Sequence, residues 1–438
     1  MYYCHLVICF EGSLYTRKIT LAAVIFLLNQ AVFLSETYQI GPSRTYTKIS
    51  EFLEAKSLKP GDVVEIFPGT YNEANTWHSQ HSGSATSPVT VRGVGAVKPV
   101  IDGTGLFIPK GNPDSLFMIY SHNIVIENLE FKNFGVKDGS SGIRIFGINV
   151  TIRNCKISHC ALGISSSSNA KNTIVEFTEI SDCINYDPNH WGHNVYMNSD
   201  SIFRYCYIHD SGKAHNFKTR GHYTELLYSY ICDANSAEVD IVDRSESGRE
   251  NSNAVLIGNV IRKRDAPAKS GYEGNPTQFI VFGQDVGGAR KGTLYLLNNT
   301  IIAGEASNKF LWLNSTDAKA VCYNNIFFGS DNVVWDDYTE TNTTGSNNWF
   351  MSSASVPSGF KDSIKGTEPG FVSLKERNFR LTGTSPCINK GISPVYQNGR
   401  GVSKPGTPDF DYIFNLKSAP RMKDALLDLG AYEYYKNK

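Results

Sequence analysis

FRYCYI at Phe203–Ile208 is followed 23 residues later by LLYSYI at Leu226–Ile231, and six further segments repeat their alternation of apolar and polar residues. These are IENLEF (126–131), IRNCKI (152–157), VEFTEI (175–180), LIGNVI (256–261), LLNNTI (296–301) and VCYNNIF (321–327). Such alternation is typical of a short strand with one buried face. One strand pattern recurring at intervals of 23 to 40 residues indicates a solenoid.

The sequence between the repeats excludes the common alternatives. No long amphipathic helix separates the strands, so they cannot form βαβ units, and the leucine-rich-repeat signature is missing. We therefore predict an all-β fold, a right-handed parallel β-helix with about eight to eleven coils stacked about 4.8 Å apart. Asparagines recur near the strand ends and should stack into amide ladders at the coil corners; they are Asn128, Asn154, Asn298 and Asn324.

Both ends of the predicted solenoid carry segments that could cover its open core. At the start, Thr47–Lys56 is predicted to form a short capping helix. At the far end, SPCINKG (385–391) and LDLGAYE (427–433) belong to a loop-rich closing segment. Residues 37–438 should thus form a single β-helix domain.

The N-terminal segment is predicted to be a signal peptide, residues 1–36. Arg17 and Lys18 precede an apolar run from Ile19 to Leu34, which is short for a membrane span; an uncleaved anchor is the alternative. The mature chain should then be secreted or periplasmic, with no stable membrane span. Of nine cysteines, Cys4 and Cys9 lie in the leader; the other seven include no CxxC pair and favour buried thiols over zinc ligands or disulfides.

The overall charge gives no evidence for a polyanionic partner. Lys plus Arg and Asp plus Glu both number 42, so the formal net charge is zero. Nothing global indicates nucleic acid or an anionic membrane. Any binding of a polyanion must therefore depend on a local cluster of residues.

Three segments supply such a cluster: GHNVYMNSD (192–200), AHNFKTRGH (214–222) and AEVDIVDR (237–244). Two sets of residues in them are spaced by 22 and should form two adjacent columns on one outer face; they are Asn194, Asn216 and Glu238, and Tyr196, Lys218 and Asp240. Counting from Ile208 and Ile231 would instead align His215 with Glu238. Strict alternation turns His193 and His215 inward, and the alternative to a site is an ordinary solvated polar face.

These residue types suit β-elimination in a uronic-acid polymer, which requires a neutralised carboxylate and removal of the neighbouring proton. Calcium could neutralise the carboxylate, held by the oxygens of Asn216, Glu238 and Asp240. Lys218 could be the base if Arg220 and calcium lower its pKa, and as an outward side chain its loss should cost under about 0.5 kcal/mol of stability. The remaining candidates are Arg220, Tyr196, His193 and His215 for catalysis, and Asn194, Asn198 and Trp191 for substrate binding.

The repeats and both end segments resemble the bacterial right-handed parallel β-helix proteins of the pectin-lyase-like superfamily, over residues 38–433. That superfamily includes pectate lyases and the chondroitinase-B and alginate-lyase group, in which an asparagine and two acidic residues bind calcium beside a catalytic lysine and arginine. The resemblance implies the same roles for Asn216, Glu238, Asp240, Lys218 and Arg220, although in that group the basic pair follows the acidic one. The implied function is a secreted lyase acting on an acidic polysaccharide.

Three other functions fit the same sequence. A glycoside hydrolase could use carboxylates from Glu238, Asp240 and Asp243. A uronan epimerase shares the proton abstraction of the lyase. A glycan-binding surface protein without catalysis could present Trp191, Tyr186 and Tyr196 as a platform for sugar rings.

Overall fold

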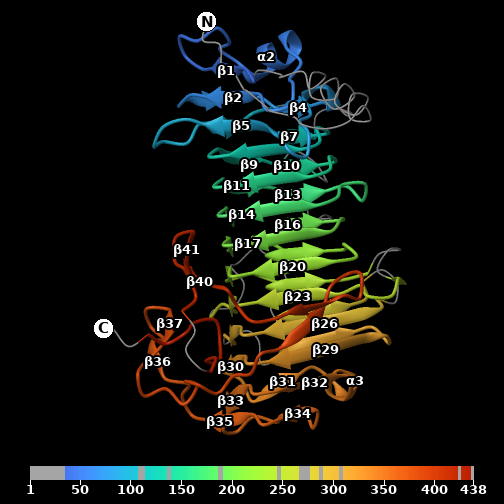
Figure 1. Ribbon diagram of the computed structural model, residues 1–438, viewed down its shortest axis with the longest axis vertical. Coiled ribbons are helices and arrows are strands. Elements are labelled where there is room, and N and C mark those ends of the chain that lie inside the picture. The colour runs from blue at the N-terminus through green and yellow to red at the C-terminus, as the bar shows by residue number, and fades with distance from the viewer. Residues whose placement is uncertain are drawn as a thin grey trace, which may run out of the picture.

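The computed structural model describes residues 35–435 except 107–113, 136–139, 186–190, 244–247, 266–276, 286–289, 305–308 and 423–425. Three parallel sheets, here called A, B and C, run the length of an elongated solenoid (Figure 1). Each coil contributes one strand to each sheet over most of the length, so the predicted parallel β-helix is confirmed. The predicted signal peptide lies almost entirely outside the described residues.

The sheets have thirteen, twelve and ten strands, so sheet C lies within the predicted range of eight to eleven coils and sheets A and B extend beyond it. Sheet A consists of β1 (Thr37–Ile40), β2 (Val63–Ile66), β5 (Val89–Gly93), β8 (Ile124–Glu127), β11 (Val150–Arg153), β14 (Thr173–Glu176), β17 (Ser201–Arg204), β20 (Thr224–Leu227), β23 (Ala254–Ile257), β26 (Gly292–Leu297), β29 (Ala318–Tyr323), β32 (Thr343–Ser346) and β34 (Phe360–Lys361). Sheet B consists of β3 (Thr70–Tyr71), β6 (Val100–Asp102), β9 (Glu130–Phe134), β12 (Lys156–Cys160), β15 (Glu179–Ser181), β18 (Tyr207–His209), β21 (Tyr230–Cys232), β24 (Val260–Arg262), β27 (Thr300–Ile302), β30 (Ile326–Phe328), β33 (Trp349–Met351) and β35 (Ile364–Gly366). Sheet C consists of β4 (Asn75–Trp77), β7 (Ser115–Ile119), β10 (Ser141–Ile145), β13 (Leu162–Ser166), β16 (His193–Met197), β19 (Phe217–Thr219), β22 (Val239–Ile241), β25 (Ile280–Gly283), β28 (Lys309–Asn314) and β31 (Asn332–Val334).

The N-terminal cap is the helix α2 (Ile49–Ala55), which buries Ile49, Phe52 and Leu53 over the first coil. The Glu73 carboxylate accepts the N–H groups of Ile49 at 2.8 Å and Ser50 at 3.1 Å, so it satisfies donors that the helix itself leaves open. The predicted capping helix is thus confirmed. Two further short helices are η1 (Ser79–His81) and α3 (Asp337–Thr341).

The interior is apolar, and its corners carry the asparagine ladders that the sequence predicted. Asn154 Nδ2 donates to Asn128 Oδ1 at 3.3 Å, and Asn324 Nδ2 donates to Asn298 Oδ1 at 3.0 Å. All four have φ between 50° and 58°, a conformation that asparagine tolerates better than most residues. The seven described cysteines are free, buried thiols.

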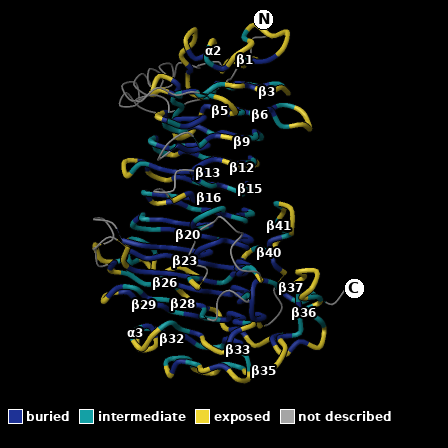
Figure 2. Tube along the Cα trace, turned by 180° about the vertical axis from the view of Figure 1, so that it is seen from behind, coloured by how far each residue is buried: buried dark blue, intermediate teal, exposed yellow. Residues whose placement is uncertain are grey.

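The C-terminal segment runs back along the solenoid instead of adding coils (Figure 1). Its hairpins are β36 (Phe371–Ser373) with β37 (Asn378–Leu381), β38 (Val395–Gln397) with β39 (Ser403–Pro405), and β40 (Phe410–Ile413) with β41 (Lys417–Pro420). Phe379 and Tyr412 pack on Tyr230 of sheet B, while Tyr396 and Phe410 pack in a cluster on sheet A. These apolar clusters include no strand of sheet C, and Figure 2 shows exposed loops concentrated in this segment and at the two ends.

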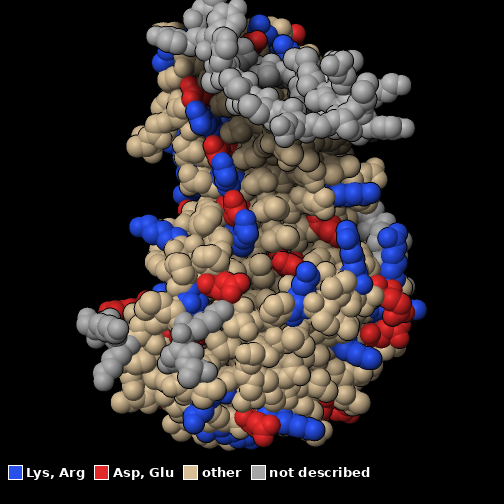
Figure 3. Space-filling view, in the orientation of Figure 1, with Lys and Arg blue, Asp and Glu red and all other residues tan. Residues whose placement is uncertain are grey.

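A column of alternating acidic and basic side chains follows the outer face of sheet A in the N-terminal half. Glu65 pairs with Arg92, Glu127 with Arg153 and Glu176 with Arg204. A stripe of alternating colour is visible down one side of these coils in Figure 3. No helix within the described part of the chain has the length and apolar character needed to cross a membrane.

Candidate active site on sheet C

Three successive coils align the predicted polar residues on sheet C. In the strand register Tyr196 lies opposite Lys218, and Lys218 lies opposite Asp240. Their inward neighbours Val195, Phe217 and Val239 align in the same way and have no exposed surface. The 22-residue register is therefore confirmed, and no one-residue slip occurs between these strands.

The first predicted column is buried, so the prediction that it faces solvent is wrong. Asn194, Asn216 and Glu238 have no exposed surface. Asn194 Nδ2 donates to Asn216 Oδ1 at 2.7 Å, and Asn216 Nδ2 donates to Glu238 Oε2 at 2.6 Å. Asn194 Oδ1 accepts the backbone N–H of Cys183, and Glu238 Oε1 accepts that of Ala234. Asn216 Oδ1 also accepts the N–H of Ser211.

The alternation fails because the chain turns from sheet B into sheet C at this column. In the preceding coils the same position is held by Gly142 and Gly163. A Cβ atom on Gly163 would lie 2.7 Å from the Ile180 side chain and 3.1 Å from Cys183 Sγ, which are core groups. The position therefore points inward, as does the next residue, Val195. The ladder of Asn194 and its partners is a structural feature of the corner.

The same bend places the histidine rings on the outer side of sheet C, so the prediction that they face inward is wrong, although neighbouring side chains leave His193 only 6% exposed. The His193 ring stacks on Tyr196 at 5.3 Å and on His215 at 5.1 Å between centroids. His215 Nδ1 accepts the backbone N–H of Ala237 at 3.0 Å, so Nε2 carries the proton and can donate to Asp240 Oδ2, 3.3 Å away. Burial lowers the pKa of both histidines well below the usual value, so both rings are neutral.

The second column carries an ion-pair cluster. Lys218 Nζ donates to Asp240 Oδ2 at 2.6 Å and to Asp285 Oδ2 at 3.0 Å. Arg220 Nη2 pairs with the same Asp285 oxygen, and Arg220 Nε donates to the Tyr196 hydroxyl at 3.1 Å. Two cations from one strand and its end therefore converge on a single carboxylate oxygen.

The charges of this cluster argue against Lys218 as a base. Burial alone would lower the pKa of Lys218, but the carboxylates of Asp240 and Asp285 outweigh burial and raise it. The lowered pKa that a basic role requires is not found, and Lys218 remains an ammonium group. Burial raises the pKa of Asp285, but the nearby cations Lys218 and Arg220 lower it by more. The net effect is a lowered pKa, so Asp285 is ionised at neutral pH.

The predicted calcium ligands do not form a common set of free oxygen donors. The carboxylate of Glu238 and the amide of Asn216 bind each other and the backbone, whereas Asp240 Oδ2 binds Lys218 and His215. Burial raises the pKa of Glu238 to about 7, and Lys263 beside it opposes that increase. No group of three or more His, Cys, Asp or Glu side chains suited to a metal occurs within the described ranges. The residues present thus do not fit the predicted ion.

The other predicted residues lie around the cluster. Asn198 Nδ2 donates to the Ser166 carbonyl at 3.0 Å, which orients its side chain toward the neighbouring coil. Trp191 is 55% exposed, with Lys213 Nζ 6.0 Å from its ring centre. Asp243 is buried, and its carbonyl accepts from Arg220 Nη1 at 2.8 Å. Tyr186 and Arg244 lie outside the described residues.

Sequence reasoning missed Asp285 and an aromatic pair. Asp285 follows β25, after an insertion that breaks the 22-residue spacing, so periodicity could not identify it. The outer column continues from Asp240 through Val281 to Trp312, whose ring stacks on Trp335 at 5.2 Å between centroids. The continuation of the outer column is the one signal that could have found Trp312.

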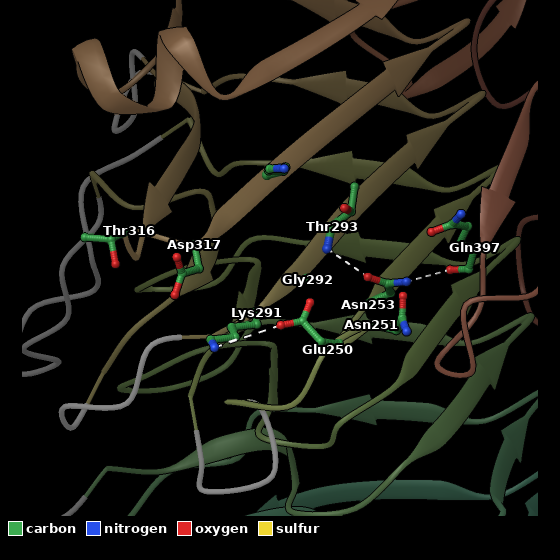
Figure 4. Close-up of a pocket in the computed structure, with 10 residues that line it drawn as sticks. Glu250, Asn251, Asn253, Lys291, Gly292, Thr293, Thr316, Asp317 and Gln397 are labelled. Atoms are coloured by element: carbon green, nitrogen blue, oxygen red, sulfur yellow. Dashed lines mark hydrogen bonds and ion pairs between the residues drawn. The ribbon is translucent and has the colours of Figure 1, made fainter.

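Two surface cavities lie at turns between sheets C and A, away from the ion cluster. One, of about 330 Å³, is lined by polar residues that include Glu250, Lys291 and Asp317 (Figure 4). The other, of about 520 Å³, lies between Asp200, His222 and the tail loop at 398–400. Neither includes Tyr196, Lys218 or Asp240 among its lining residues.

Comparison with known proteins supports the fold. Residues 108–218 match the family model described as "right handed beta helix region", and no curated protein sequence matches the chain. Pectate lyase Pel9A superposes with a TM-score of 0.57 at 15% identity, covering 92% of this chain and 98% of that one. An alginate lyase from Paenibacillus sp. str. FPU-7 gives 0.52 at 17% identity, covering 70% and 99%. XylC in complex with xylose gives 0.57 at 11% identity, covering 91% and 98%.

These similarities confirm the predicted right-handed parallel β-helix, and the solved structures that share it include a pectate lyase and an alginate lyase, the kinds of protein that the sequence resembles. At identities of 11% to 17% they establish the architecture of the chain. The chemistry therefore has to be argued from the residues on sheet C.

Proposed function

We propose that this chain, a right-handed parallel β-helix, is a polysaccharide lyase that cleaves a uronic-acid-containing polymer by β-elimination. The observation that carries the proposal is the convergence of Lys218 and Arg220 on one carboxylate oxygen beside Tyr196. Pectate lyase, alginate lyase and rhamnogalacturonan lyase are among the solved proteins that share the fold, which supports the same class of substrate. A polymer outside the cell fits the predicted secreted or periplasmic location.

The two cations suit the first requirement of the reaction. A uronate carboxylate that binds Lys218 and Arg220 is neutralised by charge-assisted hydrogen bonds, and the proton on the adjacent carbon becomes more acidic. Both cations are already fixed by other partners, Lys218 by Asp240 and Arg220 by the Asp243 carbonyl. Little reorganisation is needed as negative charge develops on the substrate.

Tyr196 is placed to move the proton. Arg220 donates to the hydroxyl oxygen of Tyr196, which holds that oxygen beside the two cations. In the proposed step Tyr196 has released its own proton to solvent, and its oxygen takes the proton from the carbon next to the carboxylate. The electrons of that C–H bond form the carbon–carbon double bond as the bond to the leaving sugar oxygen breaks. Tyr196 then returns the proton to the leaving oxygen, so the residue ends the cycle as it began. The neutral His193 ring stacked on Tyr196 keeps the phenol ring in position.

A glycoside hydrolase is disfavoured by the placement of the carboxylates. Glu238 has no exposed surface, Asp243 is 1% exposed, and Asp240 is paired with Lys218. Hydrolysis requires two carboxyl groups that face the same bond from opposite sides. These three carboxylates point to different partners, so they do not offer that arrangement.

The test is incubation with a panel of uronic-acid polymers while the ultraviolet absorbance of unsaturated products is recorded. We expect absorbance to rise for at least one polymer, and Tyr196→Phe to lower the rate about a hundred-fold or more with the fold intact. Tyr120→Phe is the matched control, because Tyr120 is exposed elsewhere on the solenoid. Shortening of the polymer without a rise in absorbance would indicate a hydrolase. A change in uronate composition without shortening would indicate an epimerase, and binding without any chemical change would indicate a glycan-binding protein.

A further inference from the structure

One carboxylate in the cluster differs from the others in its exposure. The Asp285 side chain is 36% exposed, whereas that of Asp240 is 6% exposed. Asp285 follows the end of β25, and its backbone N–H donates to Asp243 Oδ1. It is therefore the acidic group in the cluster that solvent, or a ligand arriving from solvent, can reach most readily.

The position of this carboxylate is defined by two cations. Lys218 Nζ is 3.0 Å from Asp285 Oδ2, and Arg220 Nη2 pairs with the same atom. Lys218 and Arg220 are two residues apart, so their side chains leave the same side of the strand about 7 Å apart and converge on an anion between them. Paired cationic donors of this kind recognise planar carboxylates.

Neither cation depends on Asp285 for its place. Lys218 also donates to Asp240 at 2.6 Å, and Arg220 also donates to Tyr196 at 3.1 Å and to the Asp243 carbonyl at 2.8 Å. If the Asp285 side chain withdraws, both cations keep buried partners and the same geometry. The anion position is thus preformed, and Asp285 is its removable occupant.

We propose that Lys218 and Arg220 form a carboxylate clamp that Asp285 occupies as an internal competitor, and that a uronate carboxylate of the substrate displaces Asp285. The identification of the displacing group as a uronate rests on the proposed lyase function. The clamp selects a free carboxylate, because an esterified uronate carries no charge to replace that of Asp285. Asp285 thereby acts as a specificity-determining residue against neutral sugars, which cannot compensate for the lost ion pairs.

The apparent affinity for a carboxylate ligand equals the intrinsic affinity multiplied by the fraction of molecules in which Asp285 leaves the clamp free. Removing Asp285 should therefore tighten binding of a simple uronate by about threefold to tenfold. Sodium glucuronate is the probe, and its binding is measured by titration calorimetry at constant ionic strength. The variants are Asp285→Ala, which empties the position, and Asp285→Asn, which keeps the shape and removes the charge.

Asp317→Ala is the matched control, because Asp317 is an exposed aspartate whose loss changes net charge by the same amount. Glucose tests for binding that does not need the carboxylate. We expect both Asp285 variants to bind glucuronate more tightly than wild type, and Asp317→Ala to bind it with wild-type affinity. No variant should bind glucose. In the double variant Asp285→Ala with Arg220→Gln, the increase in glucuronate affinity should be lost.

Unchanged glucuronate affinity in both Asp285 variants would overturn the proposal, and so would an equal gain in Asp317→Ala. A loss of lyase activity of a hundred-fold or more in Asp285→Asn, with intact folding, would also overturn it, because Asp285 would then take part in the reaction. If no uronic-acid polymer is cleaved but the Asp285 variants still bind glucuronate more tightly, the clamp stands and the lyase function falls.

Discussion

Replacing Lys218 with alanine should destabilise the protein, although the sequence alone predicted almost no cost. Lys218 is 6% exposed and its partner Asp240 is 4% exposed, so the change leaves a buried carboxylate with only the His215 N–H close by. Breaking a buried ion pair costs about 3–5 kcal/mol. The partly exposed Asp285 adds little and His215 compensates in part, so we expect a loss of about 2–3 kcal/mol.

A double-mutant cycle measures the origin of that loss. Urea unfolding is followed for Lys218→Ala, Asp240→Asn and the double variant, with hydrogen exchange of the β19 amides as a local probe because solenoids can unfold in parts. If the stranded carboxylate is the cause, Asp240→Asn should recover about 1–2 kcal/mol in the Lys218→Ala background. Lys218→Met keeps the apolar stem and separates packing from charge.

The reasoning fails if Lys218→Ala costs less than about 0.5 kcal/mol, as expected for a surface side chain. It also fails if the two changes are additive, because independent effects would show that the two groups are not coupled. Either result would mean that the outer face of sheet C is solvated at this column, and the carboxylate clamp would lose its structural basis.

Three further predictions concern other parts of the molecule. Desolvation lowers the pKa of His209, but Asp210 and Glu179 raise it to about 8 from 6.5. The stabilisation from protonated His209 should be complete below pH 6.5 and lost as pH rises through 8. The difference in unfolding free energy between wild type and His209→Gln should therefore shrink by on the order of 2 kcal/mol over that window. Arg290 is fully buried and donates to the carbonyls of four residues in two successive coils, in the turns after β19 and after β22. Arg290→Lys loses the planar fork and should cost about 3 kcal/mol in urea unfolding, whereas equal stability would show that the carbonyls are satisfied otherwise. Because the proposed calcium ligands are already bound to protein donors, a chelator should leave the melting temperature and any lyase rate unchanged, and a chelator-sensitive rate would restore the calcium role.

The sequence predicted the second column correctly because side chains in a strand alternate strictly and the spacing of 22 was uninterrupted. Tyr196, Lys218 and Asp240 lie in register as expected. The first column failed for a local reason: the backbone bends at the corner, so Asn194 and Val195 both face inward. A rule based on period two cannot detect such a bend, whose sequence signal is the glycine at positions 142 and 163 in the two coils before.

Asp285 was beyond sequence reasoning for a different reason. It is 45 residues after Asp240 in sequence but reaches the same ammonium group. The solenoid tolerates insertions between strands because loop closure becomes only slowly more costly with length. Residues that contact each other across such an insertion have no fixed spacing in the sequence, so only the three-dimensional structure identifies them.

The location of the site on sheet C follows from what covers the other two faces. On sheet A the outer column changes from Arg204 to Leu227, Ile257 and Leu297 in successive coils, and such an apolar surface is unfavourable in water. The tail covers this stretch with Tyr396 and Phe410, and it covers sheet B with Phe379 and Tyr412. A polymer that reaches the middle coils can therefore lie along sheet C, where Lys218, Arg220 and Tyr196 are held together by buried partners. Among the described residues, the apolar side chains that bind the tail thus decide that the middle coils are covered on sheets A and B.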